Sequence, residues 1–124
     1  MAAMSYDLAV REGDRPPDDR AGKAAYLEHA KLLEDADPAD PIPPMPRIRA
    51  YVEALLDRWP DFDEHDEHDE SPWASSPLMS EAIGSFIYFP MVYSMAEEAS
   101  AFAADLARQH GLVCYDPQLD RLRP

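Results

Sequence analysis

The most informative pattern in the sequence is an unbroken apolar run at residues 86–93, FIYFPMVY. A strand with one face in water alternates apolar and polar residues, but this run is apolar at both parities except for Pro90. The pattern therefore predicts a central strand with both faces covered. Because proline has no backbone N–H, we also expect hydrogen bonding to lapse on one side of the strand at Pro90.

A helix is predicted directly after this strand. Ser94 and Glu97 have the spacing of a capping box, in which the hydroxyl and the carboxylate each accept a hydrogen bond from an N–H at the helix start. Apolar residues, many of them alanines, then recur at three- and four-residue spacing. Gly111 suits the left-handed position that ends many helices, and residues 113–115 follow as a short strand.

The first half of the chain predicts one strand and one helix before a proline-rich connector. Residues 6–10, YDLAV, form a short apolar strand that ends at a turn-prone segment. Asp18 or Asp19 caps a helix that is predicted to run to about Leu33. The connector at residues 37–46, DPADPIPPMP, holds five prolines in ten residues, which favours an extended chain.

Three further segments complete the prediction. A helix at residues 47–59 follows Pro46 and carries a clear apolar stripe, while residues 71–78 resemble an edge strand interrupted by prolines. Residues 79–85 contain a glycine and supply a hairpin connection. The last apolar positions, Leu119 and Leu122, form a short edge strand or simply fold back.

This order of elements predicts one α+β domain over residues 1–124. The expected architecture is a ferredoxin-like two-layer sandwich, with an antiparallel or mixed sheet of about four strands and two to three helices on one face. The first strand and residues 86–93 would lie side by side at the centre. The other sheet face would then need a cover: a second copy of the chain, a foreign protein or the first helix.

Composition and charge narrow the classes of partner. The chain has 124 residues, of which 46% are hydrophobic, so it suits one modest core. It has 25 acidic against 11 basic side chains and a net charge of -14, which argues against nucleic-acid and membrane surfaces and favours a basic protein partner. Acidity that serves solubility alone is the simpler alternative. No leader-like or membrane-spanning run is recognisable, so we expect a cytoplasmic location.

No residue pattern indicates a catalytic centre or a bound cofactor. Cys114 is the only cysteine, so an internal disulfide is excluded, and its apolar surroundings predict a buried side chain rather than a nucleophile. We therefore expect no cofactor and no enzyme activity.

The most unusual segment is residues 61–70, DFDEHDEHDE, with seven carboxylates and two histidines. One interpretation is a solvated acidic loop, and another is a metal site at His65 and His68, whose spacing places both on one face of a helical turn. A third interpretation is a partner-binding surface formed by this segment and the nearby aromatic residue Trp73. The candidate partner-binding residues are Asp61, Asp63, Glu64, Asp66, Glu67, Asp69, Glu70 and Trp73.

Three segments carry a resemblance to a known family. They are YDLAVREG near the start, SPWASSPL after the acidic segment, and FIYFPMVYSMAEEASAFAADLARQHGLVCYDPQLDRLRP. With them the chain resembles a family of small acidic proteins from Streptomyces-type actinobacteria, over nearly its whole length and most strongly after Ser71. The resemblance implies a role as the immunity partner of a polymorphic toxin, and it implies no catalytic residue.

Three functions therefore compete. The first is a non-catalytic binding protein that masks a cationic partner. The second is a metal-dependent enzyme or sensor that uses His65 and His68, with Asp7 or Glu97 as additional groups. The third is a structural or regulatory homodimer that buries the free sheet face against a second copy. The charge of the chain favours the first.

Overall fold

A computed structural model of the protein describes residues 5–35, 37, 39–40, 42–61, 71–74 and 77–123. The elements follow one another as β1 (Ser5–Arg11), α1 (Asp19–Asp35), α2 (Pro46–Arg58), the 3-10 helix η1 (Leu78–Glu81), β2 (Ala82–Ile83), β3 (Phe86–Val92), the 3-10 helix η2 (Tyr93–Met95), α3 (Ala96–Gln109), β4 (Val113–Asp116) and β5 (Arg121–Leu122). The fold is α+β, as the sequence predicts.

The strands form one open antiparallel sheet in the order β2-β3-β1-β4-β5. Strands β1 and β3 pair along their whole length, from Ser5 opposite Val92 to Arg11 opposite Phe86. This pairing confirms the prediction that the first strand and the apolar run lie side by side. The sheet has five strands where about four were predicted. The described part of residues 71–78, predicted as an edge strand, contributes only an isolated bridge between Trp73 and Met91, and β2 lies instead within residues 79–85, the predicted hairpin connection. After β4 the chain forms the short edge strand β5, one of the two alternatives that the sequence left open.

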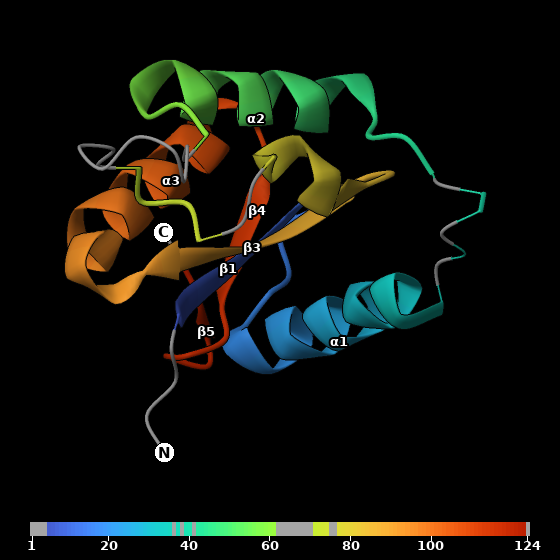
Figure 1. Ribbon diagram of the computed structural model, residues 1–124. Helices are drawn as coiled ribbons and strands as arrows, with labels where there is room; N and C mark the ends of the chain where they lie inside the picture. The colour runs from blue at the N-terminus through green and yellow to red at the C-terminus, as the bar shows by residue number, and fades with distance from the viewer. Residues whose placement is uncertain are drawn as a thin grey trace.

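Helices cover both faces of the sheet, which corrects the expectation that they lie on one face. Figure 1 shows α2 and α3 on one side of the sheet and α1 on the other. In the larger core, side chains of α2 and α3 such as Leu55 and Ala103 pack against one sheet face, to which β3 contributes Phe89. The smaller core packs Tyr26 and Leu33 of α1 against the other face. Helix α1 therefore supplies the cover that the second face of β3 requires.

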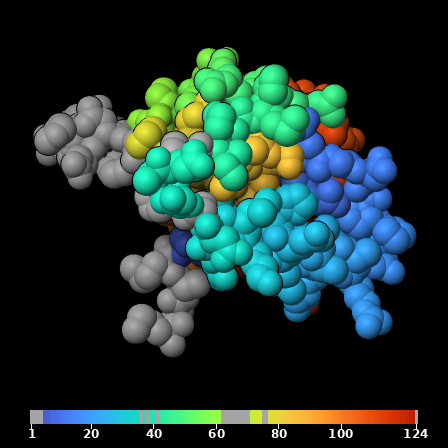
Figure 2. All heavy atoms as spheres, turned by 90° about the vertical axis from the view of Figure 1, so that its right-hand side faces the viewer, coloured from blue at the N-terminus to red at the C-terminus, as the bar shows by residue number. Residues whose placement is uncertain are grey.

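Close approach of α1 depends on Gly22, the buried residue of this helix. Gly22 faces Leu122 of β5. About one helical turn further on, the ring of Tyr26 stacks on Tyr115, and about two turns further on His29 contacts the ring of Phe86. In Figure 2 α1, in blue to cyan, lies below the gold β2–β3 hairpin, with α2 in green above it. Asp18 caps α1, since its carboxylate accepts the N–H of Ala21 at 2.8 Å, as predicted.

Helix α2 begins at Pro46, the position at which a missing N–H has no consequence, and this was predicted. Its apolar stripe is buried: Ile48, Val52 and Leu55 have no exposed surface. The hydroxyl of Tyr51 donates a hydrogen bond to the carbonyl of Ala103 at 2.9 Å and so joins α2 to α3. No helix in the described residues has the length and apolar character that crossing a membrane requires.

The prediction for the start of α3 was wrong and the one for its end was right. Tyr93–Met95 forms a 3-10 turn, α3 begins only at Ala96, and no side chain caps it, so Ser94 does not form the expected capping box with Glu97. At the other end Gly111 has φ +70°, and the N–H groups of Gly111 and Leu112 bond to the last turn of the helix. This is the glycine C-cap that the sequence indicates.

Pro90 interrupts hydrogen bonding on the outer side of β3. The N–H of Val92 bonds to the carbonyl of Pro72 at 2.8 Å, and that of Ala74 bonds to the carbonyl of Pro90 at 3.0 Å. The N–H and C=O of one residue point to the same side of an antiparallel strand. The donor that Pro90 lacks would therefore face residues 72–74 and not β1, so the central β1–β3 pairing is unaffected.

Candidate functional site

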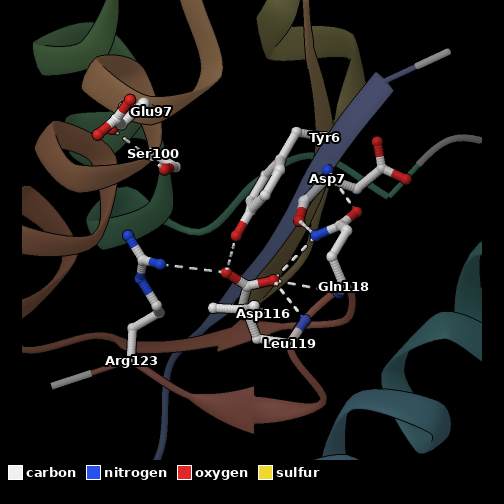
Figure 3. Close-up of polar contacts among 8 residues, drawn as sticks. All are labelled: Tyr6, Asp7, Glu97, Ser100, Asp116, Gln118, Leu119 and Arg123. Carbon is white, nitrogen blue, oxygen red and sulfur yellow. Dashed lines mark hydrogen bonds and ion pairs between the residues drawn. The ribbon is translucent and has the colours of Figure 1, made fainter. Parts of the chain in front are cut away.

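The main polar cluster of the described structure surrounds Asp116, the last residue of β4. Its side chain is fully buried, with 0% exposure. Figure 3 shows Tyr6 of β1 and Arg123, which follows β5, converging on one carboxylate oxygen. The Tyr6 hydroxyl donates a hydrogen bond to Oδ2, and Nη1 of Arg123 lies 3.2 Å from the same oxygen. A buried carboxylate is tolerated because it is paired in this way.

The other oxygen of Asp116 organises the turn between β4 and β5. Oδ1 accepts the backbone N–H groups of Gln118 at 3.1 Å and Leu119 at 3.2 Å, and the Gln118 side-chain amide at 2.9 Å. The turn also places Asp120 at φ 54°, a left-handed conformation that aspartate adopts more readily than most residues. One buried carboxylate therefore fixes both the turn and the position of Arg123.

Gln118 extends the sheet where β4 has already ended. Strand β4 pairs with β1 only at Ala9, Val10 and Arg11. At Asp7 the side-chain amide of Gln118 takes the place of a neighbouring strand: its Oε1 accepts the Asp7 N–H at 2.7 Å, and its Nε2 donates to the Asp7 carbonyl at 2.6 Å. The cluster is thereby tied to the central strand.

A group of tyrosines lies on the opposite face of the sheet, beneath α1. Tyr26 stacks on Tyr115 with ring centroids 5.1 Å apart and lies 5.9 Å from Tyr88. The Tyr88 hydroxyl donates to a carboxylate oxygen of Asp7 at 2.6 Å, and that of Tyr115 donates to Asp120. Burial, followed by these hydrogen bonds to carboxylates, raises the pKa of both Tyr88 and Tyr115.

The electrostatics of these clusters favour structure over proton transfer. Burial, and then the hydrogen bond to Asp116, raises the pKa of Tyr6 to about 12. Burial raises the pKa of the Cys114 thiol to about 12 as well, so it stays protonated at neutral pH and is a poor nucleophile. A general acid or base works best with a pKa near the operating pH. The arrangement can hold strands and the terminal turn together, but these groups are not tuned for catalysis.

The predicted partner-binding and metal residues fall into three groups. Asp61 is described and half-buried, and its carboxylate accepts the N–H of Leu78 at 2.7 Å at the start of η1. Trp73 is 1% exposed, so it is a core residue and cannot form part of a binding surface. The remaining candidates lie outside the described residues and stay predictions: Asp63, Glu64, His65, Asp66, Glu67, His68, Asp69 and Glu70.

Trp73 has a clear structural role. Its Nε1–H donates to the carbonyl of Trp59 at 2.6 Å, and its ring meets those of Trp59 and Phe89 edge to face, at 6.0 and 5.8 Å. Such contacts join the segment after the acidic run to α2 and β3. Within the part of the chain that the structure describes, no three His, Cys, Asp or Glu side chains gather as a metal site would require.

Residues that flank the acidic run on both sides have contacts at or near the start of α3. On the entry side, Arg58 at the end of α2 lies 3.4 Å from a carboxylate oxygen of Glu98. On the exit side, Pro72 bonds to Val92, which immediately precedes η2 and α3. Glu97 and Glu98 are exposed in the first turn of α3. The described residues that flank the run therefore lie close to two further carboxylates.

Comparison of the chain with protein-family models, with curated proteins and with solved structures finds no match. The resemblance to the actinobacterial family is untested by these comparisons and stays a prediction. Sequence reasoning missed the Asp116 cluster, because its partners Tyr6 and Arg123 come from opposite ends of the chain. The one local hint is that Asp116 precedes Pro117 at the end of an apolar strand, a position typical of turns.

Proposed function

We propose that the protein is a non-catalytic binding protein that uses an acidic surface to mask a cationic protein partner. We define this acidic surface as residues 61–70 together with Glu97 and Glu98. The observation that carries the proposal is that Arg58 and Pro72, which flank the run in sequence, have contacts at or near the start of α3. By sequence the run holds seven carboxylates, and Glu97 and Glu98 add two exposed ones in the first turn of α3.

The positive charges nearby are too few to neutralise this surface. Arg58 lies close to Glu98, and the amino-terminal end of α3 carries about half a unit of positive charge from its backbone dipoles. The excess of negative charge attracts a basic surface, speeds its encounter and rejects partners of the same sign.

The finer predictions from the sequence belong to this proposal. The resemblance supports an immunity protein in a toxin system, located in the cytoplasm, as the form that such a masking protein takes. The strand order β4-β1-β3-β2 supports a variant of the ferredoxin-like arrangement, in which α2 and α3 are the two crossover helices and α1 and β5 are additions. The sequence argument for a homodimer was an uncovered sheet face, and α1 packs against that face.

The test begins with the tagged protein, which is used to capture partners from an extract of its source organism. A captured basic protein is purified, and its affinity is measured at low and high salt. A variant then removes charge from the acidic run. Its substitutions are Glu64→Gln, Asp66→Asn, Glu67→Gln and Asp69→Asn. We expect the variant to bind at least about tenfold more weakly, mainly through slower association.

A matched control removes the same number of negative charges from exposed positions on and after α1. Its substitutions are Glu28→Gln, Glu34→Gln, Asp35→Asn and Asp40→Asn. This control is expected to bind the partner almost as well as the parent protein. Equal weakening by both variants, or an affinity that salt does not change, would contradict the proposal.

A further inference from the structure

A second charged surface, of opposite sign, lies at the carboxyl-terminal end of α3. A cavity of about 390 Å³ is lined by Arg15, Arg108 and Arg123. An adjoining cavity of about 430 Å³ shares Arg108 and Arg123 and adds Arg121. We call these two cavities together the arginine groove. Four of the chain's 11 basic residues border it, although the protein as a whole carries a charge of -14.

The positive charge of the arginine groove is only partly compensated. Arg123 pairs with the buried Asp116, and Arg108 pairs with Asp105 on the same helix. Arg15 donates to the backbone carbonyl of Arg123 at 2.9 Å, which uses one of its five N–H donors. Neither Arg15 nor Arg121 forms an ion pair with a carboxylate among the described residues. Four guanidinium groups therefore face two carboxylates, an excess of two positive charges.

We propose that the arginine groove binds a small molecule that carries a phosphate group. The guanidinium groups come from three separate segments, since Arg15 precedes α1, Arg108 lies in α3, and Arg121 and Arg123 lie in and after β5. A tetrahedral phosphate accepts hydrogen bonds from several directions, whereas a planar carboxylate suits a single arginine fork. The volume of each cavity is within the range of small-molecule sites.

The overall charge favours a small ligand over a polyanion. Charge interactions between exposed groups are largely screened beyond about 8–10 Å at physiological salt. A single phosphate in the groove is therefore governed by the nearby arginines. A nucleic acid would extend well beyond the groove and meet the acidic remainder of the surface, which repels it.

The carboxyl-terminal end of α3 does not cancel this attraction. The negative end of a helix carries about half a unit of charge, and its effect on a nearby ion is typically about 0.3–1 kcal/mol. Here the bonds from Gly111 and Leu112 already satisfy two of the terminal carbonyl groups. Gly13 and Gly111, which have no side chain to fill the space, also line the first cavity.

Calorimetry tests the proposal with inorganic phosphate, pyrophosphate and glycerol phosphate as probes. The test variant carries Arg15→Gln and Arg121→Gln, and Arg123 is left intact because it balances Asp116. The control variant carries Arg20→Gln and Arg49→Gln, which removes the same charge from exposed positions outside the groove. We expect one phosphate compound to bind the parent protein with 1:1 stoichiometry. The test variant should bind at least about tenfold more weakly, because lost hydrogen bonds to charged groups are costly.

Three outcomes would overturn the proposal. One is that no phosphate compound binds the parent protein at millimolar concentration. Another is that the control variant weakens binding as much as the test variant, which would show a general effect of net charge. The third is that malonate, a dicarboxylate, binds as tightly as pyrophosphate. Because the groove lies at the opposite end of α3 from the acidic surface, neutralising residues 64–69 should leave phosphate binding within about twofold, so failure of one proposal leaves the other intact.

Discussion

Gly22 of α1 lies directly against Leu122 of β5, and a Cβ at position 22 would come within 2.8 Å of the Leu122 Cγ. This contact allows α1 to reach the second face of the sheet. Gly22→Ala is expected to destabilise the protein, although alanine favours a helix by about 1 kcal/mol over glycine. Overpacking against a buried side chain costs about 1–3 kcal/mol, so the net change in the free energy of unfolding should be a loss. Urea denaturation measures the free energy of unfolding.

Two further variants separate the contributions at this contact. Ala24→Gly, at an exposed position of the same helix, reports the backbone preference alone and should cost about 1 kcal/mol. The double variant Gly22→Ala, Leu122→Ala should be less destabilised than the sum of its single changes, because the added methyl fills space that the leucine leaves. Additive effects in this cycle would show that Gly22 and Leu122 do not oppose each other.

Asp116 is expected to be the polar side chain on which stability depends most. Asp116→Ala removes the partner of Arg123 and Tyr6 and releases the N–H groups of Gln118 and Leu119. Breaking a buried ion pair from one side costs about 3–5 kcal/mol. We expect a loss of this size in chemical denaturation.

Asp116→Asn distinguishes the two tasks of this carboxylate. The amide keeps an oxygen for the turn but leaves Arg123 without a counter-charge, so the loss should be intermediate. The exposed pair of Asp105 and Arg108 provides a comparison, and Asp105→Asn should change stability little because solvent screens this pair. If Asp105→Asn and Asp116→Ala had similar effects, burial would not be the cause.

The protein should lose stability at alkaline pH. The pKa of Tyr6 is raised from 10.0 to about 12 and that of Cys114 from 9.0 to about 12, chiefly by burial. A group whose pKa is higher in the folded state contributes stability that is fully present below its unfolded pKa and lost as pH rises to its folded pKa. Denaturation midpoints should therefore fall between about pH 9 and 12.

Tyrosine variants assign part of this alkaline loss. Tyr6→Phe should flatten the decline in stability between about pH 10 and 12 while lowering stability at neutral pH. Tyr93→Phe, at a half-exposed ring, serves as the control and should follow the parent protein at every pH. An unchanged pH profile for Tyr6→Phe would mean that other groups, such as Cys114, cause the loss.

The hydrogen bond between α2 and α3 should make a modest contribution. Tyr51→Phe removes the donor to the Ala103 carbonyl and keeps the packed ring, so about 0.5–1.5 kcal/mol should be lost. Leu55→Ala, in the same buried stripe, leaves a cavity and should cost about 2–5 kcal/mol. Thermal or urea unfolding of both variants checks the order. A larger loss for Tyr51→Phe would indicate that its hydroxyl holds the two helices in register.

The sequence predicted those features that depend on neighbouring residues. The run at 86–93 predicted a strand covered on both faces, Pro46 predicted a helix start, and Gly111 predicted a helix end. Each of these features depends on the pattern or backbone conformation of residues that are close in sequence. The position of α1 was not predictable in this way. Glycine in a helix interior is unfavourable by about 1 kcal/mol relative to alanine, yet in the fold Gly22 is the residue at which α1 contacts β5.

Two side-chain roles were predicted wrongly, and one contact between distant residues was not predicted at all. Ser94 and Glu97 match a capping box in sequence, but the 3-10 turn before α3 moves Ser94 away from the cap position. Trp73, expected at a binding surface, is buried between Trp59 and Phe89. Tyr6 meets Asp116 only because β1 and β4 are neighbours, and strand order is a property of the whole fold.

The short outer strands have a consequence for behaviour at high concentration. The edge of β3 that faces away from β1 pairs with the two-residue strand β2 at one end and with the isolated bridge at Trp73 at the other. Pro90, which has no backbone N–H, lies beside this bridge. On the far side the sheet ends at β5, which is also two residues long and bears the exposed Arg121. In the described part of the chain, a strand from another molecule thus finds no long template at either border. Concentrated solutions should therefore resist fibre growth and strand exchange.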